Sequence, residues 1–510
     1  MNAEVGVAFD RTHEIGSFAN GIADPQSGRR VTPDDPVRVA SISKLGTAIG
    51  VMKLVEAGKL DLTSDVSKWL GWSLRNPSFP DRPVTLGMLL SHTASVREHD
   101  DDYVIPLGGS LQQVMADPKN WDPQHGPGDN VFRYTNLNFP IVGSIVEKVT
   151  GERFDIWMRH NVLEPMRLDA CYNWPTCSDA TVARAVELDQ NGKPVKDDLH
   201  GHRPECAVFV KDGEPCDLSL WKPGENGSLF APQGGLRISM RGLARIGRML
   251  LNNGTLDGVQ ILTPQSVATL LTQVWRFDGS NGVTDGGFYC SYGHATQQIP
   301  TPVPGCADDM GTQGHTLVGH AGDAYGMKAG LWIDRARGLG IAYFVTGIPD
   351  VAPRGPGTAF TSAETHAFRR TYALLPRLGE RQCGSTTRSS SSRTWTGRSP
   401  STATKSGSSS GSSRLSGPSS RPARRCSRCT PRRTTIPQAA SSSALPPRIL
   451  ANSMPAATSS ASSSPASPRK CTAFTSPRSA TPTARTCRSA DRSRTAPIRR
   501  RRFPHPGSPG

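Results

Sequence analysis

The chain has 510 residues and a formal net charge of +16, but this charge is unevenly distributed. Residues 384–510 contain 23 Lys and Arg residues and one acidic residue, which leaves residues 1–383 with a net charge of −6. A mildly acidic foldable region argues against nucleic-acid binding by the fold, and no apolar run reaches the roughly 18 residues of a membrane span.

The segment 384–510 is a low-complexity tail rich in Ser, Arg and Pro. Such a segment cannot bury enough apolar surface to offset its ordering entropy, so we expect it to be disordered. Two origins stay open: a natural basic arm for an acidic partner, or an out-of-frame reading of GC-rich DNA. We favour the second, because only Lys405 and Lys470 among its basic residues are lysines.

The remaining residues, 1–380, exceed the roughly 250–300 at which a single core stops growing, so we expect two lobes that share a cleft. Residues 5–9 and 15–23 predict a strand pair. Apolar residues then recur at i, i+4, i+7 and i+10 and predict a helix with one buried stripe, made by Leu45, Ile49, Met52 and Val55. Gly58 ends this helix, and Ser41 lies at its start.

Further helices are predicted at 84–91, at 136–150 with a stop at Gly151, at 237–254, and at 361–374. Residues 171–232 are loop-rich, and 327–333 with 339–346 predict a hairpin. Strands at both ends with helices between them indicate an α+β fold, in which an antiparallel sheet flanked by helices carries an inserted, mostly helical lobe.

Six cysteines cluster in loop-rich sequence, and proximity suggests the pairs Cys171–Cys177, Cys206–Cys216 and Cys290–Cys306. Six cysteines allow 15 connectivities, and six unpaired thiols in a cytoplasmic protein stay an alternative. No His stands at zinc-ligand spacing among them, so we predict no metal site. Disulfides favour an exported, periplasmic protein, although no leader precedes the first predicted strand.

Ser41 and Lys44 stand three residues apart, so on a helix they share a face. A serine hydroxyl needs a neighbouring base to become a nucleophile, and burial would lower the pKa of the lysine so that it can serve as that base. The helix start adds N–H groups that stabilise negative charge. Taken alone, this short pattern also arises by chance.

Two further groups are candidates. Tyr134 could relay a proton, and Asn136 could orient the lysine and a substrate carbonyl, although a core tyrosine with a capping asparagine is the simpler alternative. His320 precedes Gly322, which would let a substrate approach the backbone of an edge strand. The N–H of Asp323 could stabilise an oxyanion together with the N–H of Ser41.

Serine-x-x-lysine (SISK), then YTN, then HAG, with lobe-sized gaps, resembles the serine β-lactamases and penicillin-binding proteins. The resemblance is nearest to the class C β-lactamase, esterase and D-aminopeptidase branch. It extends to LLSHTAS, to the helical stretch 234–254 and to the final hairpin, over roughly residues 4–375.

The resemblance implies a covalent acyl-enzyme without metal or organic cofactor, formed on a small-molecule or peptide-like acyl substrate. Ser41 would be the nucleophile, Lys44 its base and Tyr134 part of the relay. Asn136 would hold the substrate carbonyl and Lys44, and His320 would line the third wall of the cleft. A histidine there lacks the fixed charge of the more usual lysine, which favours esters or amides over β-lactams.

One further departure from the family and two alternative functions remain. The family usually begins with a helix before the first strand, and we expect that this helix is missing here. A true β-lactamase or DD-peptidase is the alternative enzyme. A non-catalytic binding descendant, which would keep the cleft without the chemistry, is the alternative outside enzymes.

Overall fold

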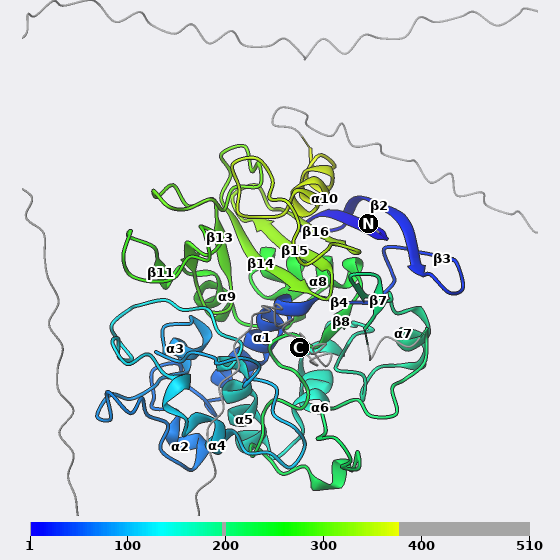
Figure 1. The fold of residues 1–510 in the computed structure, drawn as a ribbon. Helices are drawn as coiled ribbons and strands as arrows, with labels where there is room; N and C mark the ends of the chain where they lie inside the picture. Colours follow the sequence, from blue (N-terminus) through cyan, green and yellow to red (C-terminus); the bar gives the residue numbers. More distant parts are fainter. Residues whose placement is uncertain (1, 196–199, 377–510) are drawn as a thin grey trace, which may run out of the picture. The chain divides into compact units, whose positions relative to one another are not determined.

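The computed structural model describes residues 2–195 and 200–376, so the tail predicted at 384–510 and its boundary lie outside the described residues. The main feature is a nine-stranded antiparallel sheet (Figure 1). Its strands run in the order β11 (Trp275–Arg276), β12 (Ser291–Tyr292), β13 (Gln297–Ile299), β14 (Leu317–Ala324), β15 (Met327–Asp334), β16 (Leu339–Val345), β1 (Ala3–Asp10), β2 (Glu14–Asp24) and β3 (Arg29–Arg30). The predicted strand pair and hairpin are thus confirmed, and they lie side by side through the β1–β16 pairing.

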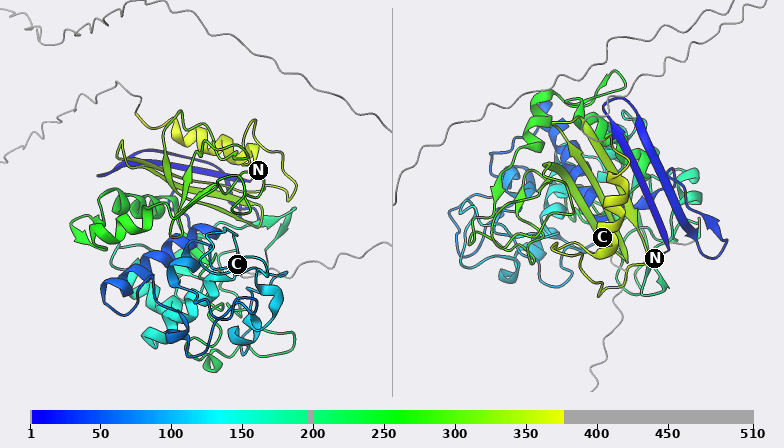
Figure 2. Two further views of the ribbon diagram at one scale, coloured as in Figure 1. Left: turned by 90° about the vertical axis from the view of Figure 1, so that its left-hand side faces the viewer. Right: turned by 90° about the horizontal axis from the view of Figure 1, so that it is seen from above.

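Helices cover both faces of this sheet. Strand β1 alternates its side chains, so that Val5 and Phe9 enter one buried cluster and Ala8 enters another. Helix α8 (Met240–Leu251) packs against the first face, and α10 (Ser362–Tyr372) packs against the opposite face (Figure 2). Both helices match predicted segments. Their shared contact with β1 and β16 makes this part a three-layer unit.

Helix α1 (Ser43–Glu56) lies between the sheet and the helical lobe (Figure 1). The predicted helix is confirmed, but the prediction of a single buried stripe is wrong. Leu54 points away from the stripe that contains Ile49, yet both side chains are almost fully buried. The helix is apolar on nearly all sides because two lobes enclose it, which a sequence period cannot reveal.

The helical lobe is an insertion. Strand β4 (Val37–Arg38) pairs with β8 (Leu236–Ile238), which also pairs with β5 (Cys171–Tyr172), so the chain leaves and returns at one place. The intervening chain contains α2 (Ser67–Leu70), α3 (Leu86–Leu90), α4 (Leu111–Met115), α5 (Asn138–Thr150), α6 (Phe154–Met158) and α7 (Asp179–Arg184). None of the helices among the described residues is both long and apolar enough to cross a membrane.

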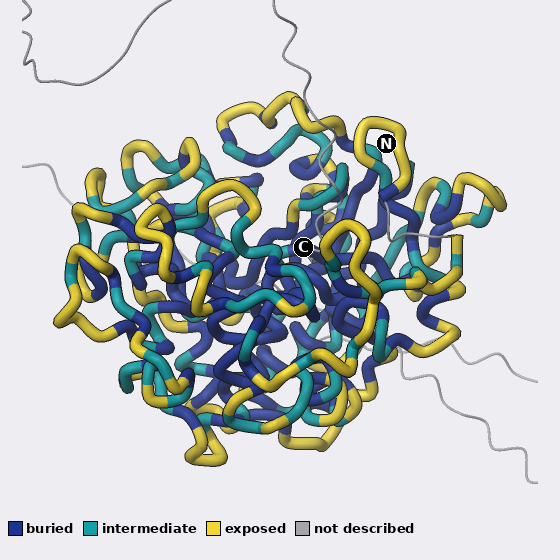
Figure 3. Tube along the Cα trace, turned by 60° about the horizontal axis from the view of Figure 1, so that its bottom comes forward, coloured by how far each residue is buried: buried dark blue, intermediate teal, exposed yellow. Residues whose placement is uncertain are grey.

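Short elements complete the fold. Helix α9 (Pro264–Leu271) contacts α1, and two small ribbons are formed by β9 (Thr255–Leu256) with β10 (Val259–Gln260) and by β6 (Asp189–Gln190) with β7 (Lys193–Pro194). Burial is concentrated where the sheet, α1 and α5 meet, whereas the connecting loops form the exposed rim (Figure 3).

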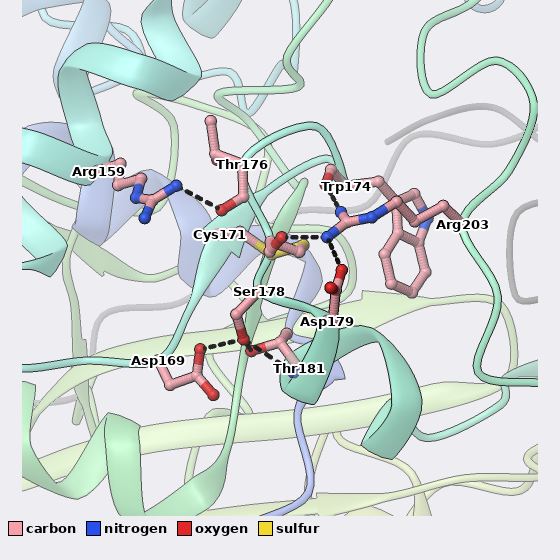
Figure 4. The surroundings of a disulfide bond; sticks show 10 residues. Arg159, Asp169, Cys171, Trp174, Thr176, Ser178, Asp179, Thr181 and Arg203 are labelled. Atoms are coloured by element: carbon pink, nitrogen blue, oxygen red, sulfur yellow. Dashed lines mark hydrogen bonds and ion pairs between the residues drawn. A yellow bond between two sulfur atoms is a disulfide. The ribbon is translucent and has the colours of Figure 1, made fainter.

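The three cysteine pairs expected from proximity are present as disulfides. Around Cys171–Cys177, the Arg203 guanidinium donates to the carbonyl oxygens of Trp174 and Cys177 and pairs with Asp179 (Figure 4). A cation therefore holds together the loop that the disulfide closes. This arrangement compensates for the scarcity of regular structure in the 171–232 segment.

We predict that Leu54→Ala destabilises the fold as much as Ile49→Ala, by about 2–5 kcal/mol each, because both side chains leave cavities in enclosed surroundings. Urea unfolding followed by circular dichroism measures both values. The exposed Val259→Ala serves as control, with a change below about 0.5 kcal/mol. A Leu54→Ala value in the range of this control would mean that only one face of α1 is packed.

Candidate active site

Ser41 lies in a one-turn 3₁₀ helix, η1 (Ala40–Ile42), directly before α1, rather than within α1 itself. Neighbouring strands hold this junction. The Leu236 N–H donates to Ser43 Oγ at 2.9 Å, and the Tyr172 hydroxyl donates to the Ser43 carbonyl at 2.9 Å. Ser41 itself is half-buried, and its hydroxyl oxygen faces Lys44 in the first turn of α1.

Lys44 is buried and makes three hydrogen bonds. Its Nζ donates to Ser41 Oγ at 3.0 Å, to Asn136 Oδ1 at 2.8 Å and to the Gln233 carbonyl at 3.0 Å. Burial lowers the pKa of the Lys44 ammonium to about 7, and the negative charge of Glu98 offsets only part of that effect. A large share of Lys44 is therefore neutral near pH 7 and able to accept a proton.

Tyr134 contacts the same serine from the other side. Its hydroxyl donates to Ser41 Oγ at 2.8 Å, and its ring stacks on Tyr289 with centroids 4.4 Å apart. Burial raises the pKa of the Tyr134 phenol well above its usual value, because the phenolate would lose its solvation. The phenol is thus a proton donor at neutral pH, and Lys44 is the better base of the two.

Asn136 is oriented by a residue that the sequence analysis missed. A carboxylate oxygen of Glu98 accepts hydrogen bonds from the Asn136 N–H at 2.5 Å, the Leu137 N–H at 3.2 Å and Thr135 Oγ1 at 3.0 Å. The Asn136 side-chain amide also donates to Glu98 at 3.4 Å. These bonds turn Asn136 Oδ1 toward Lys44. No local pattern marks Glu98, because its partners are almost 40 residues away.

The third predicted group lies on β14. His320 is buried, and its Nε2 is 2.7 Å from the Tyr292 hydroxyl, with its ring centroid 6.4 Å from that of Tyr134. Burial lowers the pKa of His320 to about 3, with Lys44 adding to the effect, so the imidazole is neutral at physiological pH. The histidine contacts the aromatic wall behind Tyr134 and does not line the pocket described below.

Gly322 brings β14 against the turn that carries Ser41. A Cβ atom there would lie 2.3 Å from the Val39 carbonyl oxygen, so only glycine fits. Strand β14 pairs with β13 only as far as Gly319, and beyond it one edge is open, whereas its pairing with β15 continues. The Ala321 N–H points to this edge, where it donates to Gln297, so the Asp323 N–H faces the same way.

A pocket of about 250 Å³ opens beside Ser41. Its polar lining includes both signs of charge, whereas its apolar wall is largely aromatic. The lining residues are Ser41, Asp285, Phe288, Tyr289, Ala321, Gly322, Asp323, Lys328, Arg354, Ala359, Phe360, Thr361 and Glu364. Three of them, Asp285, Phe288 and Tyr289, come from the chain just before Cys290. The contribution of 354–364 was not foreseen, because no motif marks it.

The chain matches the family model described as Beta-lactamase over residues 6–360. Among curated proteins, it is 27% identical to penicillin-binding protein 4 of Amycolatopsis lactamdurans over 269 residues, which cover 51% of this chain and 63% of that protein. The chain therefore spans less than two thirds of this relative's length.

Solved structures with the same fold include the octameric penicillin-binding protein homologue from Pyrococcus abyssi, with a TM-score of 0.51, 18% identity and 73% of each chain covered. The D-amino acid amidase from Ochrobactrum anthropi SV3 has a TM-score of 0.51 at 17% identity and covers 73% of this chain and 93% of its own. At these identities the likeness concerns the fold. Together with the match over residues 6–360, it identifies this chain as a member of the β-lactamase family.

Proposed function

We propose that this protein is a serine hydrolase that forms a covalent acyl-enzyme through Ser41. The observation that carries the proposal is the position of one serine oxygen between two proton-transfer groups, Lys44 Nζ at 3.0 Å and the Tyr134 hydroxyl at 2.8 Å. A nucleophile within hydrogen-bond reach of its base, with the base oriented by a third group, is the arrangement that covalent catalysis requires. Asn136 is that third group.

In the proposed reaction, neutral Lys44 takes the hydroxyl proton while Ser41 Oγ bonds to the acyl carbon. The carbonyl oxygen becomes an oxyanion, for which the N–H groups of Ser41 and Asp323 are the candidate donors. Breaking the bond to the leaving group releases an alcohol or amine, which takes a proton from Lys44 or, through it, from Tyr134. Water then attacks the acyl carbon and releases the acid together with free Ser41.

Esters or amides are the favoured substrate class. The third motif contributes a neutral, buried His320 rather than a cation, so it offers no fixed charge to a β-lactam carboxylate. The pocket wall of Phe288, Tyr289 and Phe360 suits an apolar or aromatic acyl or leaving group. Binding of small acyl compounds is therefore expected next to Ser41.

A β-lactamase or DD-peptidase is the second candidate, and Arg354 favours it. The Arg354 guanidinium lines the pocket and makes no ion pair within residues 2–195 and 200–376, so it could bind a substrate carboxylate. Turnover of a chromogenic cephalosporin within a few hundred-fold of the rate for an activated ester would support this reading. Failure of every β-lactam tested to acylate the protein would contradict it.

We further propose that the protein is exported. Three disulfides in one fold are typical of oxidising compartments and rare in reducing ones. The disulfides are evidence only about the cellular compartment, and the proposed reaction at Ser41 does not depend on that compartment.

Labelling with a fluorophosphonate tests the nucleophile. We expect one adduct per chain on the parent protein by intact mass and none on Ser41→Ala, because Ser41 Oγ lies 3.0 Å from Lys44 Nζ, whose pKa is lowered by burial to about 7. Ser43→Ala is the matched control and should still be labelled, since Ser43 Oγ is occupied by the Leu236 N–H. A folded parent that takes no label would contradict an activated serine and favour a non-catalytic binding role.

The base should be visible in the pH dependence. Because the pKa of Lys44 is about 7 and the neutral amine is the active form, we expect kcat/KM for an activated ester to rise through pH 7 and level off above it. Lys44→Arg keeps the charge but cannot deprotonate, so kcat/KM should fall by about 10²–10⁴. A pH profile that is flat from 6 to 9, or an active Lys44→Arg, would exclude this base.

Glu98 is expected to act as a positioning residue. Its charge raises the pKa of Lys44, so Glu98→Gln should move the inflection of the kcat/KM profile to lower pH and reduce the plateau, because Asn136 loses its orientation. Steady-state kinetics across pH measure both effects. Glu164→Gln, in an exposed pair with Arg159, should leave the profile unchanged. An unshifted inflection with a lower plateau would indicate a purely structural loss.

A further inference from the structure

Three side chains of the kinds that bind metal ions lie together at the end of β2, and none of them belongs to the site at Ser41. Asp24, Glu187 and His200 each contribute one atom to a group in which all atoms lie within 4.8 Å of one another. His200 Nδ1 is 3.0 Å from Asp24 Oδ1 and 2.7 Å from Glu187 Oε2. We propose that these three side chains form a binding site for a divalent transition-metal ion, with zinc as the best fit.

The backbone brings the two carboxylates together. Asp24 is the last residue of β2, and the Glu187 N–H donates to the Ala23 carbonyl at 2.8 Å, so the chain around Glu187 runs beside that strand end. His200 completes the group from the loop that follows β7. The two carboxylates are more than 160 residues apart in sequence, which is why cysteine and histidine spacing gave no indication of a metal site.

One carboxylate oxygen of this group lacks a hydrogen-bond donor. Glu187 Oε2 is buried and accepts no hydrogen bond, although His200 Nδ1 lies close to it. Only 6% of the Glu187 side chain is exposed. A buried carboxylate oxygen without a donor is unfavourable unless it is paired with a cation or coordinates a metal. It points toward the other two ligand atoms.

The net negative charge of these three side chains also favours a bound cation. Within residues 2–195 and 200–376, no Lys or Arg forms an ion pair with Asp24 or Glu187. A neutral His200 leaves two negative charges uncompensated, and a protonated one still leaves a net charge of −1. A divalent ion would neutralise this group.

The surroundings fit a bound ion with an open side. The Asp24 carboxylate is fixed by the Gln26 N–H at 2.9 Å and by Ser27 Oγ at 2.6 Å, which orients it as outer-shell partners orient metal ligands. His200 is 35% exposed, so water can reach the group and complete the coordination. An imidazole nitrogen with two carboxylates suits zinc, at bonds of about 2.0–2.2 Å, better than calcium or magnesium.

The competing explanation is an imidazolium held between two carboxylates. It requires a protonated His200 and predicts that zinc has no effect on stability. The two explanations therefore differ in whether added zinc raises the melting temperature of the protein.

The test measures zinc bound by the full chain after treatment with a chelator, dialysis and alkylation of free thiols. Alkylation is needed because five cysteines outside the three disulfides could also bind zinc. We expect isothermal titration at pH 7.5 to show one equivalent of zinc bound by the parent, with an increase in melting temperature. His200→Ala and the nearly isosteric Glu187→Gln should each weaken this binding by more than about tenfold.

The matched control is His202→Ala, which removes an exposed histidine two residues from the group and should bind zinc as the parent does. Circular dichroism establishes whether each variant is folded. If His200→Ala does not fold, the zinc affinity of Glu187→Gln alone tests the proposal. Equal zinc binding by the parent and both ligand variants would overturn the proposal. So would a parent that binds no zinc and whose melting temperature depends only on pH.

Discussion

The buried ammonium of Lys44 is the group on which the arrangement of this protein depends. Transfer of a lysine from water into the interior disfavours its charged form. The fold provides three hydrogen-bond acceptors for Lys44 Nζ, which are Ser41 Oγ, Asn136 Oδ1 and the Gln233 carbonyl. These acceptors come from three distant parts of the chain. A lysine with a pKa near neutrality is therefore a property of the assembled lobes rather than of helix α1 alone.

The enclosure of Lys44 explains the position of α1. An amphipathic helix on a surface would leave one side in water, and its lysine would stay charged. Here the sheet covers one side of α1 and the inserted lobe covers the other, so that even Leu54 on the far side is buried. Gly322 completes the junction, since β14 can approach the Ser41 turn only without a Cβ atom. Burial that stabilises the fold thus also lowers the pKa of Lys44, the proposed base.

The periphery contributes differently. The pocket wall next to Ser41 combines aromatic side chains with Asp285, Lys328, Arg354 and Glu364. Burial raises the pKa of Glu364 to about 8, so part of this charge pattern changes near physiological pH. We therefore expect the substrate preference of this protein to depend on this wall, because interior side chains surround Ser41.

The sequence alone determined the strands at both ends and the long helices, because period-two and period-3.6 patterns are local properties. Proximity along the chain suggested the disulfide pairs, which the structure then decided among 15 connectivities. The sequence also brought Ser41, Lys44, Tyr134 and Asn136 together as candidates, through the order of their motifs and the resemblance to a family. Tertiary structure alone decided that α1 is buried on both sides, that His320 lies behind the aromatic wall, and that Glu98 orients Asn136. It also brought Asp24, Glu187 and His200 into one group. The physical reason is that burial and hydrogen bonding between distant segments leave no periodic trace in the chain.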